Sequence, residues 1–433
     1  MSVINVGIIG FGTVGVGTFE VLTKNREIIT NRVGMDVIVK KIADLDIKTD
    51  RGVEVHHSLF TKDAMDVIDD PDIDIIVELI GGTTKAKEYI LKAIERGKNV
   101  VTANKALLAE CGKEIFEAAE RYGSGLAFEA SVGAGIPIIG ALKGGLSANR
   151  IQTILGILNG TSNFILTKMA KEGLFYSQAV QDAVNLGFAE DPPTLDVDGT
   201  DAAHKLAVLL SINFGTTAPF EDIYREGIDS LTPDDIRFAR ELGYSVKLLA
   251  IARMLDDRIE ARVHPAMIPK NHILANVNSE YNAIYIDGDF VGPNLYYGLG
   301  AGKSSTGSAV VADIMNMSRQ IRVGLKGSAP PLGHIHPPDK EIMIQPMEEL
   351  ITSYYLKVTA LDRPGVLSMI SGILGENHIG ISSVIQKGRQ INGSVPIVML
   401  THEARESDVQ KAVLLLNNLD ILTGKTVTIR VEE

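Results

Sequence analysis

The stretch Val-Ile-Asn-Val-Gly-Ile-Ile-Gly-Phe-Gly-Thr-Val-Gly at residues 3–15 decides how the first part of the chain folds. Residues 3–9 are rich in β-branched side chains, which is typical of a buried parallel strand. The pattern G-x-G-x-x-G follows at residues 10–15, and residues 14–22 read as a helix. Glycines at this spacing allow a tight turn, the close approach of a pyrophosphate and close packing of helix on strand. A glycine-rich turn without a ligand is the weaker interpretation, and we expect a cofactor to contact Gly10, Phe11, Gly12, Thr13, Val14 and Gly15.

Further strands are expected along the chain, each followed by a helix or a glycine-rich turn. They are residues 37–43, 74–80, 99–102 and 125–129, with helices over 85–96 and 105–122. Alternating strands and helices indicate an α/β fold, a Rossmann-type doubly wound parallel sheet. Ligands bind at the carboxyl ends of the strands in such a sheet. We therefore expect further cofactor-binding residues there, namely Asp44, Thr83, Thr102, Ala103 and Lys105.

Two of these residues carry charges that bear on function. An acid at the position of Asp44 accepts hydrogen bonds from the adenosine ribose and favours NAD over NADP. Lys40, Lys41 and Arg51 are close enough in sequence to bind a 2′-phosphate, so the residues leave the cofactor preference open. Lys105 begins a helix, where a positive charge opposes the helix dipole, so a purely structural reason for this lysine is poor.

A second informative stretch, at residues 187–206, reads Gly-Phe-Ala-Glu-Asp-Pro-Pro-Thr-Leu-Asp-Val-Asp-Gly-Thr-Asp-Ala-Ala-His-Lys-Leu. Its Pro-Pro pair forces an extended segment, and a helix can resume near residue 199 or 200. Asp201 and Lys205 then share one helix face, with an apolar run below them. Carboxylates beside a lysine at the mouth of an apolar helix suit the binding and protonation of a small polar molecule. The alternative is a surface Asp–Lys pair, and the residues alone favour the two about equally.

Two glycine-rich stretches lie further from these. Residues 129–137, Glu-Ala-Ser-Val-Gly-Ala-Gly-Ile-Pro, let backbone carbonyls converge beside one carboxylate and could bind a hard monovalent cation. A tight turn before a helix at Pro137 is at least as good an interpretation of these residues. Residues 298–307 have the wrong spacing for a Walker motif. They predict a return of the chain into the first domain near the cofactor, with Gly302 as a contact.

After residue 150 the pattern changes, and the remaining strands predict an antiparallel sheet followed by a small separate unit. The expected strands are residues 151–158, 245–254, 258–264 and 281–286, and Asn-Gly-Thr-Ser-Asn at 159–163 is expected to cap a helix after the first of them. Residues 327–339 are rich in proline and predict a linker, in which His334 and His336 are expected to be solvated rather than to bind a metal. From Ser353 the order is βαββαβ, a ferredoxin-like sandwich able to fold alone. Its first helix N-terminus offers backbone N–H groups to an anion such as a carboxylate.

Composition limits the class of protein. The chain of 433 residues is long enough for two or three domains, and its net charge of −12 argues against a nucleic-acid binder. Cys111 is the only cysteine, which excludes an intramolecular disulfide and fits a reducing cytoplasm. No stretch is apolar for long enough to form a membrane helix, and the N-terminus is expected to be a strand rather than a signal peptide.

Together these motifs carry a family resemblance over essentially the full length. The chain resembles bacterial homoserine dehydrogenase with a C-terminal ACT domain. The matching segments are 10–15 and 129–137, quoted above, Thr-Ala-Asn-Lys at 102–105, Leu-Asn-Gly-Thr-Ser-Asn-Phe-Ile-Leu at 158–166, Gly-Phe-Ala-Glu-Asp-Pro at 187–192, Asp-Val-Asp-Gly-Thr-Asp-Ala-Ala-His-Lys at 196–205 and Asp-Arg-Pro-Gly-Val-Leu at 362–367.

The resemblance implies an activity, a set of site residues and a regulator. The activity is the NAD(P)-dependent interconversion of L-homoserine and L-aspartate 4-semialdehyde, on the route to threonine, methionine and isoleucine. The implied roles are catalysis by Lys105 and Lys205, substrate binding by Glu190, Asp196 and Asp201, and binding of sodium or potassium by Glu129, Val132, Ala134 and Ile136. ACT domains usually bind an amino acid at a subunit interface, so threonine feedback and a homodimer or homotetramer are implied. The implied domains are 1–135 with a return helix at 302–325 for NAD(P), 136–301 for catalysis, a linker at 326–350 and the ACT domain at 351–433.

These residues suggest a mechanism. Lys205 would protonate the carbonyl oxygen during reduction and act as a base in reverse, since two lysines in one pocket depress each other's pKa. Lys105 would hold the oxygen or the cofactor–substrate geometry, Asp201 would orient the ammonium, and Glu190 would bind the amino or hydroxyl group. The rival hypotheses are an amino-acid sensor with an inactive dehydrogenase part and a dehydrogenase for another small aldehyde.

Overall fold

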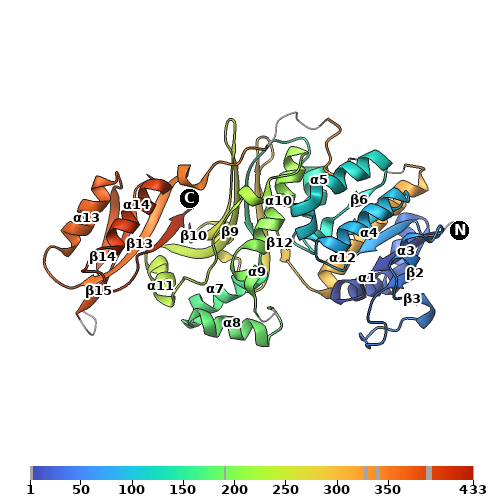
Figure 1. The fold of residues 1–433 in the computed structure, drawn as a ribbon, viewed down its shortest axis with the longest axis horizontal. Coiled ribbons are helices and arrows are strands. Elements are labelled where there is room, and N and C mark those ends of the chain that lie inside the picture. The colour runs from blue at the N-terminus through green and yellow to red at the C-terminus, as the bar shows by residue number, and fades with distance from the viewer. Residues whose placement is uncertain (1–2, 190–191, 326–329, 337–341, 387–392, 433) are drawn as a thin grey trace.

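The computed structural model describes residues 3–189, 192–325, 330–336, 342–386 and 393–432, and all structural statements below concern these residues. The chain forms three units arranged along the long axis of the molecule (Figure 1). The N-terminal unit lies at one end, the C-terminal unit at the other, and an antiparallel sheet with its helices lies between them.

The N-terminal unit contains a six-stranded sheet in the order β3-β2-β1-β4-β5-β6, with every neighbouring pair parallel. Its strands are β1 (Val3–Ile9), β2 (Asp36–Ala43), β3 (Phe60–Thr61), β4 (Ile75–Glu78), β5 (Asn99–Thr102) and β6 (Leu126–Ala127). The order reverses between β1 and β4, so the expected parallel α/β sheet is confirmed. The expected strand at 125–129 is shorter than predicted, because Glu129 already belongs to a 3-10 turn, Glu129–Ser131.

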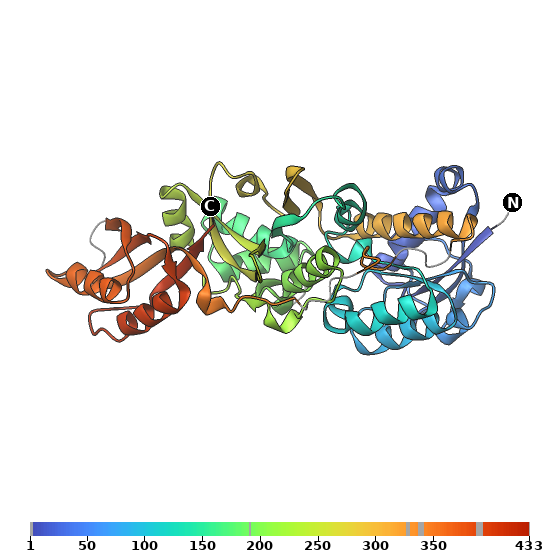
Figure 2. The same cartoon turned by 90° about the horizontal axis from the view of Figure 1, so that it is seen from above.

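Helices cover both faces of this sheet (Figure 2). On one face lie α1 (Thr13–Lys24), α2 (Arg26–Val33) and α12 (Lys303–Arg322), and on the other lie α4 (Thr84–Glu95) and α5 (Lys105–Tyr122). The chain returns to this unit through α12, which packs closely on α1. A Cβ on Gly307 would lie 2.6 Å from the carbonyl carbon of Gly17, so only glycine allows this approach.

The middle unit is built on antiparallel strands. They are β7 (Ile151–Ile157), β9 (Tyr244–Met254), β10 (Ile259–Pro269), β11 (Tyr281–Gly288) and β12 (Gly292–Leu299). The associated short strand and helices are β8 (Tyr224–Arg225), α7 (Gly160–Glu172), α8 (Tyr176–Asn185), α9 (Thr194–Val197), α10 (Thr200–Phe214) and α11 (Pro233–Glu241). The antiparallel pairing is confirmed, whereas β12 was not predicted. As an edge strand with alternating exposed residues, β12 lacks the continuous apolar run of its neighbours.

The C-terminal unit has the βαββαβ order over its described residues. Its elements are β13 (Ile351–Leu361), α13 (Val366–Glu376), β14 (Ile381–Gln386), β15 (Ser394–Thr401), β16 (Ala404–Arg405), α14 (Glu406–Asn417) and β17 (Val427–Val431). Its four main strands follow the order β17-β13-β15-β14, with all neighbours antiparallel. The expectation of a separate sandwich missed one feature, because β17 also pairs in parallel with β10. The sheets of the middle and C-terminal units are therefore one sheet of eleven strands.

Three observations bear on the predicted linker, on metal binding and on membranes. His334 is half-buried and its Nε2 donates to the carbonyl of Ile212 at 3.0 Å, so the prediction that it is solvated was wrong, whereas His336 is exposed. Within the described ranges, no group of three or more His, Cys, Asp or Glu side chains could hold a metal ion. Likewise, none of the helices that the structure describes is long and apolar enough to cross a membrane.

Candidate active site

Asp201 and Lys205 lie one turn apart near the start of α10. The helix begins after Gly199, whose φ of 88° is left-handed, and the predicted helix start is confirmed. Lys205 Nζ donates to Asp201 Oδ2 at 2.7 Å and to the carbonyl of Leu158 at 2.6 Å. The side chain of Asp201 is 10% exposed and that of Lys205 is 9% exposed, so this is a buried ion pair rather than a surface Asp–Lys pair.

Lys105 reaches the same carboxylate from the other unit. It is the first residue of α5, and the preceding Asn104 caps that helix by accepting from the Leu107 N–H at 3.1 Å. Lys105 Nζ lies 3.0 Å from Asp201 Oδ1, and its side chain is 40% exposed. A single carboxylate therefore lies between two ammonium groups, one from each unit, and Lys105 is the more accessible of the two.

Asn159 completes the arrangement around Asp201. Its Nδ2 donates to Asp201 Oδ2 at 2.8 Å and to Asp196 Oδ1 at 2.7 Å. Its Oδ1 accepts from the Ser162 N–H at 2.7 Å, which caps α7 as predicted. The side chain thus joins Asp196 and Asp201, a role that the sequence did not indicate because the cap alone explained this residue.

Asn282 on β11 is a second residue that sequence reasoning missed. Its Nδ2 donates to the Leu158 carbonyl at 2.8 Å, the same oxygen that accepts from Lys205. Its Oδ1 is buried without a hydrogen-bond partner among the described residues. A Cβ on Gly300 would lie 2.0 Å from the Asn282 amide nitrogen, so only a glycine at position 300 leaves room for the Asn282 side chain. No local pattern signals these contacts, since they join distant segments.

Burial and mutual charge set the protonation of these groups. Burial opposes ionisation of Asp201, but Lys205 and Lys105 outweigh it and hold the pKa of Asp201 well below its usual value. Burial lowers the pKa of Lys205, the ammonium of Lys105 lowers it further, and Asp201 acts in the opposite direction. Burial raises the pKa of Asp196, and the charge of Asp201 adds to that shift. The site therefore holds a permanent carboxylate beside a lysine that gives up its proton more readily than a solvated lysine.

A further contact joins α5 and α10 beside this site. His204 Nε2 lies 3.0 Å from Glu110 Oε1, and the His204 ring stacks on Phe220 with ring centroids 4.4 Å apart. Burial lowers the pKa of His204, and the Glu110 carboxylate opposes that shift. Two side-chain pairs, Lys105–Asp201 and Glu110–His204, thus hold the N-terminal unit against the middle unit at the lysines.

The glycine turn after β1 has the geometry that a dinucleotide requires. Gly10 has φ of 99°, and a Cβ on Gly15 would lie 2.3 Å from the Gly10 carbonyl oxygen, which accounts for the tight turn. A Cβ on Gly12 would meet nothing within 4 Å, so open space lies directly before the N-terminus of α1, which begins at Thr13. The first N–H groups of a helix have no partner within the helix, so these residues fit a bound pyrophosphate.

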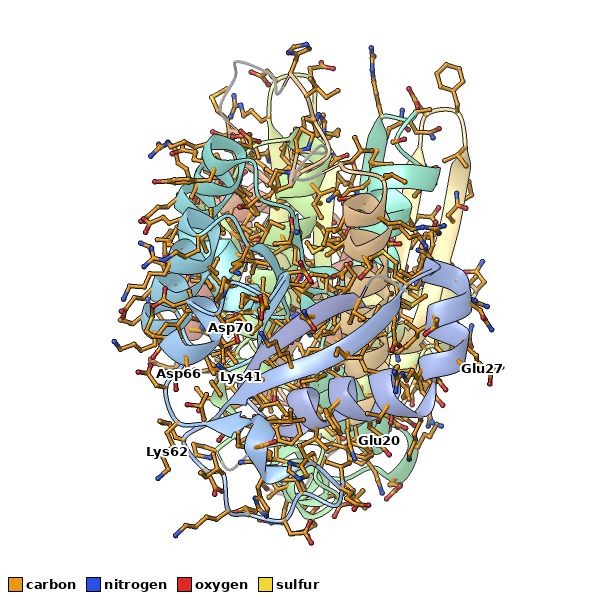
Figure 3. All side chains as sticks on the ribbon, turned by 90° about the vertical axis from the view of Figure 1, so that its right-hand side faces the viewer. Glu20, Glu27, Lys41, Lys62, Asp66 and Asp70 are labelled. Atoms are coloured by element: carbon orange, nitrogen blue, oxygen red, sulfur yellow. The ribbon has the colours of Figure 1, made fainter. Side chains whose placement is uncertain are left out.

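The charges near Asp44 differ from the simple expectation. Asp44 Oδ2 accepts from the Phe11 N–H at 2.6 Å, and Arg51 Nη2 lies 3.4 Å from Asp44 Oδ1. Lys40 instead pairs with Asp70 and Asp72, and Lys41 Nζ lies 3.3 Å from Asp70 Oδ2. Figure 3, which looks onto the N-terminal unit from the end of the molecule, shows Lys41 beside Asp66 and Asp70. Of the three basic residues considered for a 2′-phosphate, Arg51 is the one that lies against Asp44.

The ends of β4 and β5 are tied together by Glu78, which the sequence did not single out. Glu78 Oε2 accepts from Thr102 Oγ1 at 2.7 Å, and Oε1 accepts from the Ile80 N–H at 2.8 Å. Burial raises the pKa of Glu78. Asn104 Nδ2 donates to the Gly82 carbonyl at 2.7 Å. These bonds hold the turn that leads to Thr83 against Thr102 and the residues before Lys105. The sequence signal that could have identified Glu78 is a glutamate placed directly at the end of a buried strand.

The residues expected to bind a cation lie in the loop after β6. Glu129 Oε1 and Oε2 accept from the N–H groups of Ile139 and Gly140 at 2.9 and 2.7 Å, so the carboxylate is engaged by backbone. Ala134 has a left-handed φ of 45°, and Val132 and Ile136 are buried. A cation in this loop would therefore depend mainly on backbone carbonyl oxygens. Ser305, in the first turn of α12 just after Gly302, lies beside this loop, because a Cβ on Gly135 would lie 3.1 Å from Ser305 Cβ.

Glu190 belongs to the pair of residues, 190 and 191, that lies outside the described ranges, so its predicted role stays a prediction.

Comparison with known proteins places the chain in a family. The family model for the homoserine dehydrogenase NAD-binding domain matches residues 10–129, and the model for homoserine dehydrogenase matches residues 137–315. A homoserine dehydrogenase of Pseudomonas aeruginosa is 45% identical, and the match covers 100% of both chains. The chain belongs to the homoserine dehydrogenase family. It is therefore an NAD(P)-dependent oxidoreductase.

Other homoserine dehydrogenases agree over the full length. That of Neisseria gonorrhoeae is 43% identical over 100% of this chain and 99% of its own. The crystal structure of a homoserine dehydrogenase from Thiobacillus denitrificans superposes with a TM-score of 0.93 at 45% identity and covers 100% of this chain and 99% of that one. A homoserine dehydrogenase of S. aureus gives a TM-score of 0.76 at 34% identity, with the same coverage. The three-unit architecture described above is thus shared along the whole chain.

Proposed function

We propose that this protein catalyses the reversible NAD(P)-dependent interconversion of L-homoserine and L-aspartate 4-semialdehyde. The observation that carries the proposal is the Lys105–Asp201–Lys205 group, in which one buried carboxylate joins a lysine of the cofactor-binding unit to a lysine of the middle unit. Full-length relatives named homoserine dehydrogenase support it. A reaction that moves both a hydride and a proton needs the cofactor and a proton donor in contact with one small molecule.

In this proposal Lys205 is the acid and base. When bound, the nicotinamide supplies or accepts the hydride. As the carbonyl oxygen gains negative charge during reduction, the Lys205 ammonium stabilises it and gives up a proton. In homoserine oxidation the neutral amine takes the hydroxyl proton. The lowered pKa of Lys205 supports both directions, because a solvated lysine would stay protonated near neutral pH.

The neighbouring residues position the substrate. Lys105, which is more exposed than Lys205, holds the reacting oxygen from the cofactor side. Asp201 orients the Lys205 ammonium, while Asp196 and Glu190 bind the substrate's ammonium group. Asn159 supports this division of roles, since its amide donates to both Asp196 and Asp201 and keeps their carboxylates a fixed distance apart.

The cofactor residues proposed are those of the glycine turn, Asp44, Thr83, Thr102, Ala103, Lys105 and Gly302. Arg51 beside Asp44 supports acceptance of a 2′-phosphate as well as a ribose hydroxyl. An archaeal homoserine dehydrogenase, 27% identical over 73% of this chain, has been solved in complex with NADPH. A sodium or potassium ion held by the backbone of Glu129, Val132, Ala134 and Ile136 would brace the connection between the cofactor-binding and middle units.

The remaining roles follow the division of the chain. We assign NAD(P) binding to residues 1–135 with 302–325, catalysis to 136–301, linkage to 326–350 and regulation to 351–433. The βαββαβ order of the last unit supports an ACT domain, and with it an amino-acid effector, of which L-threonine is the candidate. A cytoplasmic homodimer or homotetramer that supplies threonine, methionine and isoleucine biosynthesis completes the proposal.

The test follows the oxidation of NADH and of NADPH with L-aspartate 4-semialdehyde, and their formation from L-homoserine, with and without L-threonine. We expect turnover in both directions and a lower rate with threonine. Silence with both substrates and both cofactors would refute the proposed reaction. Turnover that threonine leaves unchanged would refute only the proposed effector.

A further inference from the structure

A buried arginine links the C-terminal unit to the middle unit. Arg430 lies on β17, is 7% exposed, and reaches the middle unit because β17 pairs with β10. Its Nε and Nη2 donate to the two carboxylate oxygens of Glu406 on α14, at 2.8 and 2.6 Å. Its Nη1 donates to Glu226 Oε2 at 2.6 Å. Glu406 belongs to the C-terminal unit and Glu226 to the middle unit, so one guanidinium bridges the two. Figure 1 marks the C-terminus beside β10.

Glu226 is held firmly where it meets Arg430. Tyr224, on β8, donates from its hydroxyl to Glu226 Oε2 at 2.9 Å, and the Arg430 guanidinium lies 5.1 Å from the centre of its ring. The Glu226 N–H donates to the Val263 carbonyl on β10 at 2.9 Å. A guanidinium that donates to several carboxylate oxygens at once is well ordered, because few side-chain conformations satisfy all of these hydrogen bonds.

The residues that follow Glu226 lie directly against the segment between Asp196 and Asp201. The Ile228 N–H donates to the Val197 carbonyl at 2.9 Å. A Cβ on Gly227 would lie 2.6 Å from that same oxygen and 3.0 Å from the Asp198 Cα. The Glu226 carbonyl oxygen lies 3.5 Å from where a Cβ on Gly199 would sit. Residues 226–228 therefore pack against residues 197–199 and fix the position of their backbone.

We propose that Arg430 and Glu226 are positioning residues for the substrate-binding carboxylate Asp196, so that the C-terminal unit contributes to substrate affinity through a continuous chain of contacts. The inference rests on the proposed function, because Asp196 is assigned there to the substrate's ammonium group. Arg430 and Glu226 have no described contact with Lys105 or Lys205. Loss of their pairing acts on the placement of Asp196, while Asp201 keeps its contacts with Lys205, Lys105 and Asn159, so the proton donor is unchanged.

The same interface offers a matched control. Arg262 Nη2 donates to Glu432 Oε1 at 2.6 Å, and both side chains are 2% exposed. This pair also joins β10 to the end of the chain. The charged partners of Arg262 are Glu260 and Glu432, not Glu226. A purely structural role of the interface predicts similar effects when either pair is broken, whereas a positioning role singles out Glu226 and Arg430.

The experiment compares Glu226→Gln, Arg430→Lys and Glu432→Gln in the full-length chain. We expect Glu226→Gln and Arg430→Lys to raise KM for L-homoserine about tenfold, with kcat changed less than about threefold and the Kd for NADPH unchanged. Lysine keeps the charge of Arg430 but cannot form its two-sided fork. We expect Glu432→Gln to lower Tm by about as much as Glu226→Gln and Arg430→Lys do. Unlike them, it should leave KM for L-homoserine unchanged.

Hydrogen exchange of the free proteins gives a readout that does not depend on the reaction. We expect faster amide exchange over residues 194–201 in Glu226→Gln and wild-type exchange there in Glu432→Gln. An equal rise in KM or in exchange for Glu432→Gln, or no change for Glu226→Gln, would overturn the inference. If wild type does not turn over homoserine, the proposed function fails, and the exchange comparison still decides whether Glu226 positions this segment.

Discussion

Replacing Lys205 by methionine isolates the proton donor, because methionine has a similar length and fills the same buried space without the ammonium. Each partner that loses Lys205 keeps another donor. The Leu158 carbonyl still accepts from Asn282 Nδ2 at 2.8 Å. Asp201 still accepts from Asn159 Nδ2 at 2.8 Å and keeps Lys105 at 3.0 Å. The variant therefore leaves no orphaned polar group at these positions, and we expect it to fold.

The expected sizes follow from these contacts. Breaking a buried ion pair costs about 3–5 kcal/mol when the other charge is left uncompensated. Here Asp201 keeps one lysine and one amide, so we expect Lys205→Met to lower the free energy of unfolding by about 1.5–3 kcal/mol, the contribution of a hydrogen bond to a charged group. Loss of a general acid or base typically costs about 10²–10⁴-fold in rate. That fall in kcat corresponds to about 3–5 kcal/mol of activation free energy.

The assay measures kcat in both directions, the Kd for NADPH and the unfolding free energy, with Lys247→Met as the control. Lys247 is a second buried lysine, 3% exposed, whose Nζ donates to Asn163 Oδ1 at 3.1 Å. It has no described contact with Asp201. We expect Lys247→Met to lose stability with little change in kcat, and Lys205→Met to lose kcat while binding NADPH normally. A Lys205→Met enzyme with wild-type kcat would refute the assignment of the proton donor.

Three further changes test the site and the fold. Asp201→Asn removes the charge that favours protonated Lys205, so the Lys205 pKa falls further. Because oxidation needs the neutral amine, the acidic limb of the pH profile of kcat for homoserine oxidation should move to lower pH. A limb that does not move would contradict this. Arg51→Ala should raise KM for NADPH about tenfold or more and leave KM for NADH within about twofold; equal effects on both would exclude a 2′-phosphate contact. Gly307→Ala places a Cβ 2.6 Å from the Gly17 carbonyl carbon, and should lower the free energy of unfolding by about 1–3 kcal/mol in a denaturant titration; unchanged stability would show that α1 and α12 separate easily.

The elements that could be predicted are those whose signal lies within a few residues. The strand over residues 3–9 and its glycine turn were read from β-branched residues and from glycines at fixed spacing, and β1 has the predicted bounds. The helix over 105–122 was predicted with its bounds, because Gly123 ends it in a left-handed conformation. By contrast, β3 has only two residues and forms by pairing with β2, so no local pattern marks it.

The contacts of the candidate active site also separate into those that the sequence could predict and those that it could not. Asp201 and Lys205 could be paired from sequence, since residues four apart share a helix face. The meeting of Lys105 with Asp201 could not, because it requires α5 to dock against α10. Asn159 was recognised as a helix cap, but its contacts with Asp196 and Asp201 depend on where α9 lies. Asn282 carries no local signal of its own.

The sequence by itself determined the local structure, the succession of a parallel and an antiparallel unit, and the identity of the residues that carry charge. Dihedral preferences, helix periodicity and caps act over a few residues, so they are legible in a linear chain. Only the tertiary structure decided that two lysines share one carboxylate and that β17 joins β10 to place Arg430 against Glu226. Those contacts follow from the burial of apolar faces between distant segments, and it is that burial which removes the charges from water and makes their pairing strong enough to shift a pKa.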